Sequence, residues 1–457
     1  MNIKIRNKDK AKKQESCKQK LNNFQVYMFM IQTSIVIKSH FPEFLELLSN
    51  VSDYRERPQY KVEELLMAVV CMFLFKRGSR NAMDNTMKKG LFATNISQIF
   101  KCDLPDLDTS NKLLEELDPK ELEEIKQKMI EKLIRKKLLS KFRIFNLYYL
   151  VAIDGTGVQS FSKEPYPACP FKTSKNGVKV WTTYVLEAKI VCTNGFSFSI
   201  ATEWLKNPTD KEYDKQDCEL KAFIRLTEKI KKSNPRLPII ITADGLYPNN
   251  TAFDRCKNNN WLFIFTFKNG NLKTIWKEIN LLKDNNKAKH ESIHKTKAKF
   301  SQIDNYTYLN DLEYKEHKVH FIELTSIKEY VKDNKKENKY FAHITNIKIN
   351  NENFSQISEA GRLRWKIENE GFKEQKDKKD GYGLTHKFSR KSFKAQQNYY
   401  QCLQIAHMIN QLAYKSKKTE DMITGNDTNK SFLEASIALL MWEEINVSVN
   451  EKCNFRY

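Results

Sequence analysis

Apolar residues recur with helical spacing over the first third of the chain. Between Phe24 and about Leu139 they return every three or four residues, which predicts amphipathic helices. The almost wholly apolar segment 62–70 predicts a buried helix, and Pro119 favours the start of a long helix over residues 121–139. We therefore expect an all-helical domain over residues 23–140, preceded by a flexible basic arm over residues 1–22, where lysines are many and apolar residues few.

After Phe145 the pattern changes to short apolar runs that are rich in aromatic and β-branched residues, as is typical of strands. Strands are expected at residues 148–157, 178–192, 196–204, 237–245 and 261–267, and helices at residues 216–232 and 250–258. The turn sequence 193–195 predicts a hairpin between the second and third strands. The order is strand, strand, strand, helix, strand, helix, strand, which predicts an α/β fold with a mixed sheet and flanking helices.

The rest of the chain contains a polar interruption and then further helices. Residues 269–339 are Lys-rich with short alternating runs, which predicts a β-rich insertion, and residues 340–346 predict a strand that returns to the sheet. Helices are expected at residues 357–376 and 394–412, with a basic loop between them. The resulting boundaries are a sheet domain over residues 141–268 and 340–415, an insertion over residues 269–339 and a C-terminal tail over residues 416–457.

Charge and cysteine usage narrow the function classes. Lys and Arg number 78 against 56 for Asp and Glu, a net charge of +22, which indicates a polyanionic partner such as nucleic acid. The alternative is a solvated surface that reflects a Lys- and Asn-rich composition. Such a charge favours DNA binding by the helical domain, although a helical scaffold that packs on the sheet would fit its pattern equally well.

The nine cysteines are scattered and include no CxxC pair, which argues against a disulfide framework and a structural zinc site. This usage fits a reducing cytoplasm. The longest apolar run, Leu65 to Phe75, is too short to span a bilayer, and the N-terminus has no apolar signal-peptide core. We expect a soluble, cytoplasmic, nucleoid-associated protein that has no membrane partner.

Two of the expected strands end on an aspartate that a glycine follows, at Asp154 and at Asp244. The strand order is similar to that of ribonuclease-H-like folds, in which the first and fourth strands lie side by side and parallel. Both carboxylates would then emerge at the same end of the sheet. An aspartate in this position also commonly serves as a turn or helix-cap residue.

A third acid is expected from the helix that begins near residue 357. Arg364 and Glu368 are four residues apart and would share a helix face. An ordinary solvent-facing ion pair is the alternative interpretation of this spacing. Glu370 remains a second candidate for the third acid, since Phe372 follows it. Two other acids, Asp217 and Glu219, stand at a helix start and suit capping, and Glu203 could support the site from the end of the third strand.

The segment from Arg364 to Glu368, Arg-Trp-Lys-Ile-Glu, resembles the Arg-Trp-x-Ile-Glu signature of DDE transposases of the IS4-like group. The signature of that group reads Tyr, two residues, Arg, three residues, Glu, six residues, Lys. This chain has Gly361 at the Tyr position and Gln375 at the Lys position, with Lys376 next. The strands that end at Asp154 and Asp244 resemble the group's first two acidic motifs, and the β-rich insertion is similar as well.

The resemblance implies an RNase H-like catalytic domain and a DNA transposase that cuts the ends of its insertion sequence and joins the 3′-OH to target DNA. It implies catalytic and metal-binding roles for Asp154, Asp244 and Glu368, with two Mg²⁺ ions for which Mn²⁺ may substitute, since hard cations take oxygen ligands. Arg364, Lys376 and Tyr247 would contact DNA. The implied partners are double-stranded DNA at terminal inverted repeats and at the target, and a second copy of the chain on that DNA.

Two alternatives stay open at this point. One is a catalytically silent DNA-binding protein of transposase origin, and the other is a metal-dependent, structure-selective nuclease. The silent DNA-binding protein would not need the acidic residues for catalysis, and the nuclease would cut DNA without strand transfer.

Overall fold

The computed structural model describes residues 33–208, 216–332, 335–389, 392–416 and 429–444, except for the side chains of residues 429–432. The expected arm, residues 1–22, lies outside this part. The chain divides into two compact units, which we call the helical unit (residues 1–133 and 374–457) and the sheet unit (residues 134–373). Each unit is described by itself below.

The helical unit begins, in its described part, with helical residues 33–40. Its further helices are α2 (Phe44–Ser49), α3 (Val62–Leu74), α4 (Arg80–Met87), α5 (Phe92–Phe100), α6 (Leu107–Glu116), α7 (Pro119–Arg135), α12 (Glu374–Lys376), α13 (Phe393–Tyr414) and α15 (Asn429–Trp442). Every residue of α3 after Glu64 is buried, because the helix is apolar all round and packs against α2, α6 and α13. The helices expected in this part of the chain are present.

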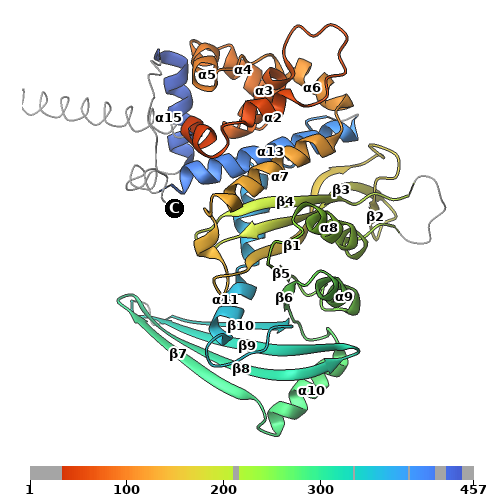
Figure 1. Ribbon diagram of the computed structural model, residues 1–457, viewed down its shortest axis with the longest axis vertical. Helices are drawn as coiled ribbons and strands as arrows, with labels where there is room; N and C mark the ends of the chain where they lie inside the picture. The colour runs from red at the N-terminus through yellow and green to blue at the C-terminus, as the bar shows by residue number, and fades with distance from the viewer. Residues whose placement is uncertain (1–32, 209–215, 333–334, 390–391, 417–428, 445–457) are drawn as a thin grey trace, which may run out of the picture. The chain divides into compact units, whose positions relative to one another are not determined.

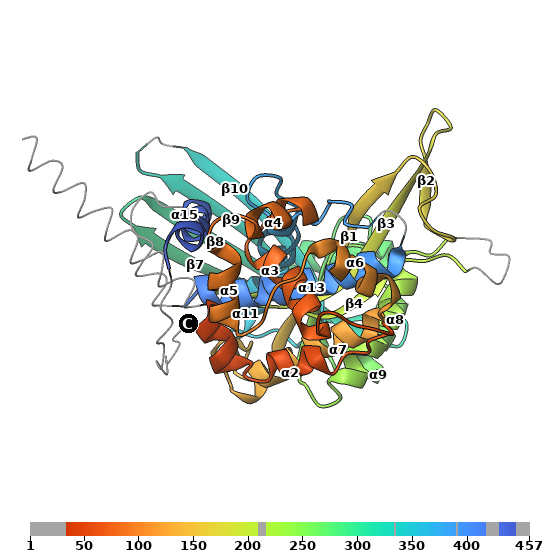
Figure 2. The same ribbon diagram turned by 90° about the horizontal axis from the view of Figure 1, so that it is seen from above.

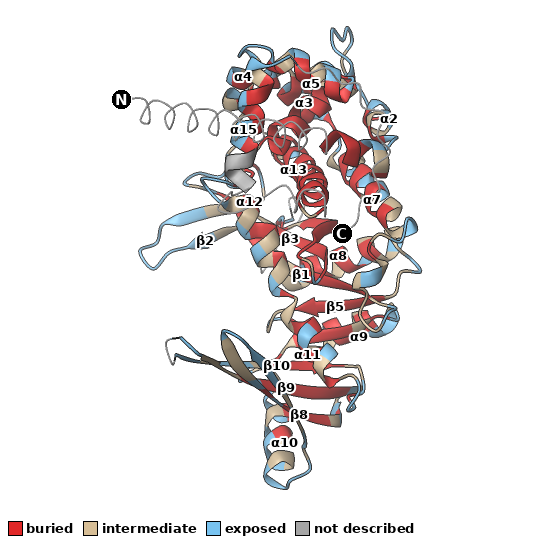
Figure 3. Cartoon of the chain, turned by 90° about the vertical axis from the view of Figure 1, so that its left-hand side faces the viewer, coloured by how far each residue is buried: buried red, intermediate tan, exposed pale blue. Residues whose placement is uncertain are grey.

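Two C-terminal segments complete this unit. Helix α13 is buried from Tyr399 to Tyr414 and packs on α3 and α6 (Figure 3). The amide of Asn398 donates hydrogen bonds of 2.9 Å and 2.8 Å to the carbonyls of Leu114 and Leu117. Helix α15 packs on α5, where the amide of Asn95 donates to the Leu440 carbonyl. The sequence pattern had grouped α13 with the sheet, because a single apolar face does not show which partner covers it.

The sheet unit contains ten strands (Figure 1). They are β1 (Tyr149–Phe161), β2 (Phe171–Thr173), β3 (Lys179–Val191), β4 (Ser197–Trp204), β5 (Ile239–Ala243), β6 (Leu262–Thr266), β7 (Lys289–Lys297), β8 (Phe300–Tyr314), β9 (His317–Tyr330) and β10 (Lys336–Thr345). Its helical segments are η1 (Ser140–Phe142), α8 (Glu219–Ser233), α9 (Asn250–Asn258), α10 (Lys273–Asp284), α11 (Phe354–Arg362) and η2 (Ile367–Lys373). The predicted α/β class with a mixed sheet is confirmed.

The strands form one sheet in the order β2-β3-β1-β5-β6-β10-β9-β8-β7, with β4 also paired to β3. β3 is antiparallel to β1 and β4, whereas β1, β5 and β6 are mutually parallel neighbours. The expected hairpin at residues 193–195 joins β3 to β4, with Gly195 at φ +88°. β5 is buried along its whole length, as its continuous apolar sequence requires (Figure 3).

The predicted insertion, residues 269–339, is part of the same sheet. β10 pairs with β6 on one side and β9 on the other, and β8 and β7 follow outward. The segment opens with a helix, α10, that the strand-like pattern did not predict; it buries Ile275 and Ile279. At the far end of the sheet the exposed β2–β3 hairpin extends away from the other strands (Figure 2).

No helix in the described ranges is long and apolar enough to cross a membrane.

Candidate active site

The parallel neighbours β1 and β5 bring two carboxylates together. Ile153 pairs with Ala243 in the β1–β5 register, so Asp154 and Asp244 occupy the next positions on adjacent strands. Asp154 Oδ1 accepts the Gly155 amide at 3.0 Å, and Asp244 Oδ1 accepts the Leu246 amide at 2.8 Å. The two aspartates are side by side on neighbouring parallel strands, as expected. The expected strand end at Asp154 is wrong, however, because β1 continues to Phe161 through its pairing with β3, whereas Asp244 directly follows β5.

An arginine from a distant segment reaches the first aspartate. Arg364 Nη1 lies 3.2 Å from Asp154 Oδ2, although 210 residues separate them in sequence. Its guanidinium also lies over the Trp365 ring, 5.0 Å from the ring centre. Arg364 is 8% exposed, so this ion pair is largely shielded from water. A buried guanidinium needs a carboxylate partner, and Asp154 supplies it.

The surroundings of Asp154 disfavour the ionised form of its carboxyl group. Burial raises the pKa of Asp154 from its ordinary value of 3.8 to about 6, and the negative charges of Asp244 and Glu219 add to the rise. Arg364 and the hydrogen bond from the Gly155 amide act in the opposite direction. The effect of burial outweighs the attraction of Arg364, so the pKa of Asp154 is raised even though an arginine pairs with it.

Glu219 is a site residue that the sequence assigned to helix capping. It is the first residue of α8, yet its carboxylate turns toward β1 and accepts the hydroxyls of Tyr184, at 2.6 Å, and Tyr247, at 3.4 Å. Gly155 makes room for it, because a Cβ at that position would lie 2.7 Å from Glu219 Cδ. The glycine that follows Asp154 was the one sequence signal of this close approach.

Tyr247 does not have the role expected from the sequence. Its side chain is fully buried against Phe223 and Phe265, so it offers no surface for direct contact with DNA. The tyrosine belongs to the apolar layer beneath the site, and its hydroxyl helps orient Glu219. Tyr247 therefore lies close to the acidic residues and supports Glu219, but it does not contact DNA.

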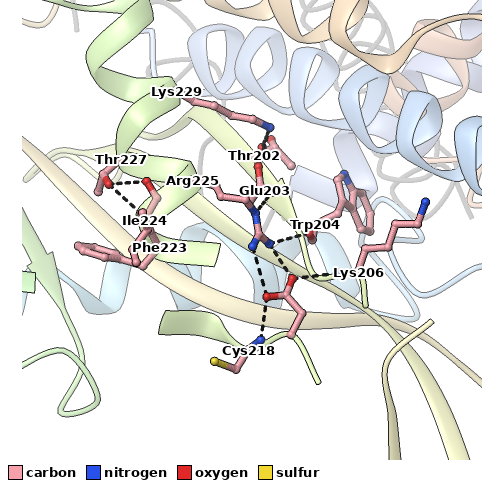
Figure 4. A network of polar contacts seen from close by, with 11 residues as sticks. Thr202, Glu203, Trp204, Lys206, Cys218, Phe223, Ile224, Arg225, Thr227 and Lys229 are labelled. Carbon is pink, nitrogen blue, oxygen red and sulfur yellow. Dashed lines mark hydrogen bonds and ion pairs between the residues drawn. The ribbon is translucent and has the colours of Figure 1, made fainter. Parts of the chain in front are cut away.

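A polar network fixes α8, and so Glu219, against β4 (Figure 4). Arg225 donates to Glu203 Oε1 at 2.7 Å and to Asp217 Oδ2 at 2.6 Å. Lys229 Nζ also lies 2.8 Å from Glu203 Oε2. Glu203 and Asp217 therefore anchor helix α8. Neither belongs to the acid centre, by which we mean Asp154, Asp244 and Glu219.

The segment expected to supply the third acid is helical but irregular. α11 ends at Arg362, Ile367 N then donates to the Arg364 carbonyl three residues back, and the wider π-type turn of η2 follows. Glu368 is half-buried, with no ion pair or hydrogen bond to any described residue. Glu370, the alternative, forms an ion pair with Lys366. Irregular turns of this kind often occur at functional sites.

Lys376 lies in the helical unit, on α12. It lines a cavity of about 460 Å³ together with Lys76, Arg77, Lys378 and Lys379, where the expected basic loop folds back. The lining also includes Asp377 and Glu434, so the pocket is mixed in charge but predominantly basic.

The donor chemistry of the acid centre suits a hard divalent cation. Asp154, Asp244 and Glu219 offer only carboxylate oxygens, which are the ligands that such cations prefer. Within the described residues, however, no group of three or more His, Cys, Asp and Glu side chains is arranged to hold a metal ion.

Neither the family models nor the curated proteins searched contain a match to this chain. The functional assignment therefore depends on the residues and on the geometry described above.

Proposed function

We propose that this protein is a DDE-type DNA transposase that cuts the ends of its own insertion sequence and joins the freed 3′-OH to target DNA. The observation that carries the proposal is the meeting of three separate segments: Asp154 and Asp244 on adjacent parallel strands, and Arg364 within hydrogen-bond distance of Asp154. These are the segments that resemble the transposase motifs.

The strand order supports an RNase H-like catalytic domain. Strands β4, β3 and β1 are antiparallel neighbours, and β5 and β6 follow on the other side of β1 and run parallel to it. This is the strand order expected of that fold. Ligands bind beyond the carboxyl ends of parallel strands in open α/β sheets, and Asp154 and Asp244 occupy that edge.

Asp154 and Asp244 would hold the magnesium, for which manganese may substitute. Glu368 would supply the third carboxylate if the π-type turn of η2 rearranges on binding, since it is half-buried and not engaged by any described residue. Glu370 is less available because its carboxylate already forms an ion pair with Lys366. Bound there, two Mg²⁺ ions would activate an attacking oxygen and stabilise the leaving oxygen of an in-line phosphoryl transfer.

The chain's own residues would position the DNA. Arg364 holds Asp154 and also lines a cavity of about 640 Å³ together with Lys268, Arg362 and Trp365, where a DNA phosphate would find positive charge. Lys376 and the basic pocket of the helical unit would contribute a second phosphate contact. The net charge of +22 supports a DNA partner, and cutting two ends calls for two copies of the chain on the DNA.

The test is cleavage of a plasmid that carries the DNA flanking the protein's own gene, in Mg²⁺ or Mn²⁺. Wild type is compared with Asp154→Asn and with Asp284→Asn, a control at an exposed aspartate at the end of α10. Cutting at both gene borders by wild type and control, but not by Asp154→Asn, supports the transposase. Cutting that ignores sequence favours a nuclease, and tight binding without cutting favours a catalytically silent DNA-binding protein. Both contradict the proposal.

A further inference from the structure

His343 and Gly361 make an unusually close contact within the sheet unit. If Gly361 carried a Cβ, that atom would lie 2.4 Å from both Cδ2 and Nε2 of His343 and 2.8 Å from Cε1. Ordinary contacts of a Cβ are 3.4 Å or longer. The imidazole of β10 therefore occupies the space that any side chain at position 361, including the tyrosine of the transposase signature, would take up.

The imidazole is almost wholly buried. His343 is 3% exposed, its backbone lies in β10 between Thr266 of β6 and Ile322 of β9, and it lines the cavity of about 640 Å³ together with Gly361. Its Nδ1 is buried without a hydrogen-bond partner among the described residues. Burying an unpaired polar atom costs stability, so the ring occupies this place at a penalty. Burial, with Arg362 and Arg364 nearby, lowers the pKa of His343 to about 4, so the ring is neutral at neutral pH.

The contact controls how closely the end of α11 approaches the sheet. Gly361 is the penultimate residue of α11, and Arg364 N donates to its carbonyl at 3.4 Å. A side chain at position 361 would push this turn outward by about 1 Å, the difference between the 2.4 Å approach and an ordinary contact. The Arg364–Asp154 distance of 3.2 Å would then exceed the range of an ion pair.

We propose that His343 is a positioning residue. Packed against the backbone of Gly361, it fixes how far the Arg362–Arg364 turn lies from the sheet, so that the guanidinium of Arg364 reaches Asp154. The structural part of this inference stands by itself, and its catalytic consequence rests on the proposed function. A misplacement of about 1 Å at a reacting centre can lower a rate by about 100-fold.

The test uses Gly361→Ala, His343→Ala, the double variant, and Asp284→Asn as a control at an exposed residue of α10. We expect Gly361→Ala to cut border DNA about 100-fold more slowly than wild type. Adding His343→Ala should restore part of the lost rate, because the ring that the new methyl group meets is gone. Asp284→Asn should cut at nearly the wild-type rate.

Crystal structures of wild type, Gly361→Ala and the double variant provide a readout that does not depend on activity. We expect the distance from Arg364 Nη1 to Asp154 Oδ2 to rise above ion-pair range in Gly361→Ala and to return toward 3.2 Å when His343→Ala is added. An unchanged distance in Gly361→Ala, or a distance that His343→Ala does not shorten, would overturn the positioning role, as would strictly additive losses in the double variant. If wild type does not cut border DNA at all, the proposed function fails, while these distances still decide whether His343 positions Arg364.

Discussion

Replacing Asp154 by asparagine should remove a pH-dependent loss of stability while abolishing activity. The pKa of Asp154 is raised from 3.8 to about 6, so the folded protein binds the proton more tightly than the unfolded chain does. The stability contributed by this group is therefore present at low pH and lost as the pH rises from about 4 to about 7. The full difference corresponds to about 3 kcal/mol of unfolding free energy in wild type. Asparagine does not titrate and escapes this loss.

The assay is urea unfolding of wild type, Asp154→Asn and the control Asp284→Asn, with the transition of the sheet unit followed by tryptophan fluorescence. Between about pH 4 and about pH 8 we expect wild type to lose up to about 3 kcal/mol of unfolding free energy relative to Asp154→Asn, as the wild-type carboxyl ionises. Asp284→Asn should follow wild type at every pH. A difference between Asp154→Asn and wild type that is the same at all pH values would refute this account of the site.

Three further changes test the supports of the site and the helical unit. Tyr184→Phe removes the 2.6 Å hydrogen bond to Glu219 and should cost about 1.5–3 kcal/mol in thermal unfolding, with no change in the circular-dichroism spectrum; an unaltered melting temperature would mean that Glu219 finds another partner. Gly155→Ala places a methyl group 2.7 Å from Glu219 Cδ and should cost about 1–3 kcal/mol, whereas the double variant with Glu219→Ala should recover part of it; a cost that persists would locate the strain elsewhere. Asn95→Ala removes donors to the Leu440 and Glu443 carbonyls and should expose α15 to limited proteolysis at protein concentrations where wild type resists; equal resistance would show that apolar packing alone holds this helix.

The local patterns predicted most of the sheet. The strands at β1, β3, β4, β5 and β6 and the helices α8 and α9 agree with the apolar runs to within a few residues. Such runs are short, β-branched and bounded by turn residues, so local chemistry selects the strand in each case. Helix α10 was missed although its apolar residues recur with helical spacing, because the alternating runs of the surrounding Lys-rich segment favoured strands; it packs on β8.

The candidate site divides in the same way. The sequence by itself determined that Asp154 and Asp244 follow buried apolar runs and that Arg364 lies in a segment that resembles the transposase signature, because each of these facts is local. Only the tertiary structure decided that Glu219 turns from a helix start toward the acids, that Tyr247 is buried beneath them, and that His343 occupies the space beside Gly361. Each of these depends on side chains that are distant in sequence and compete for one volume, and no periodicity along the chain records which of them fills it.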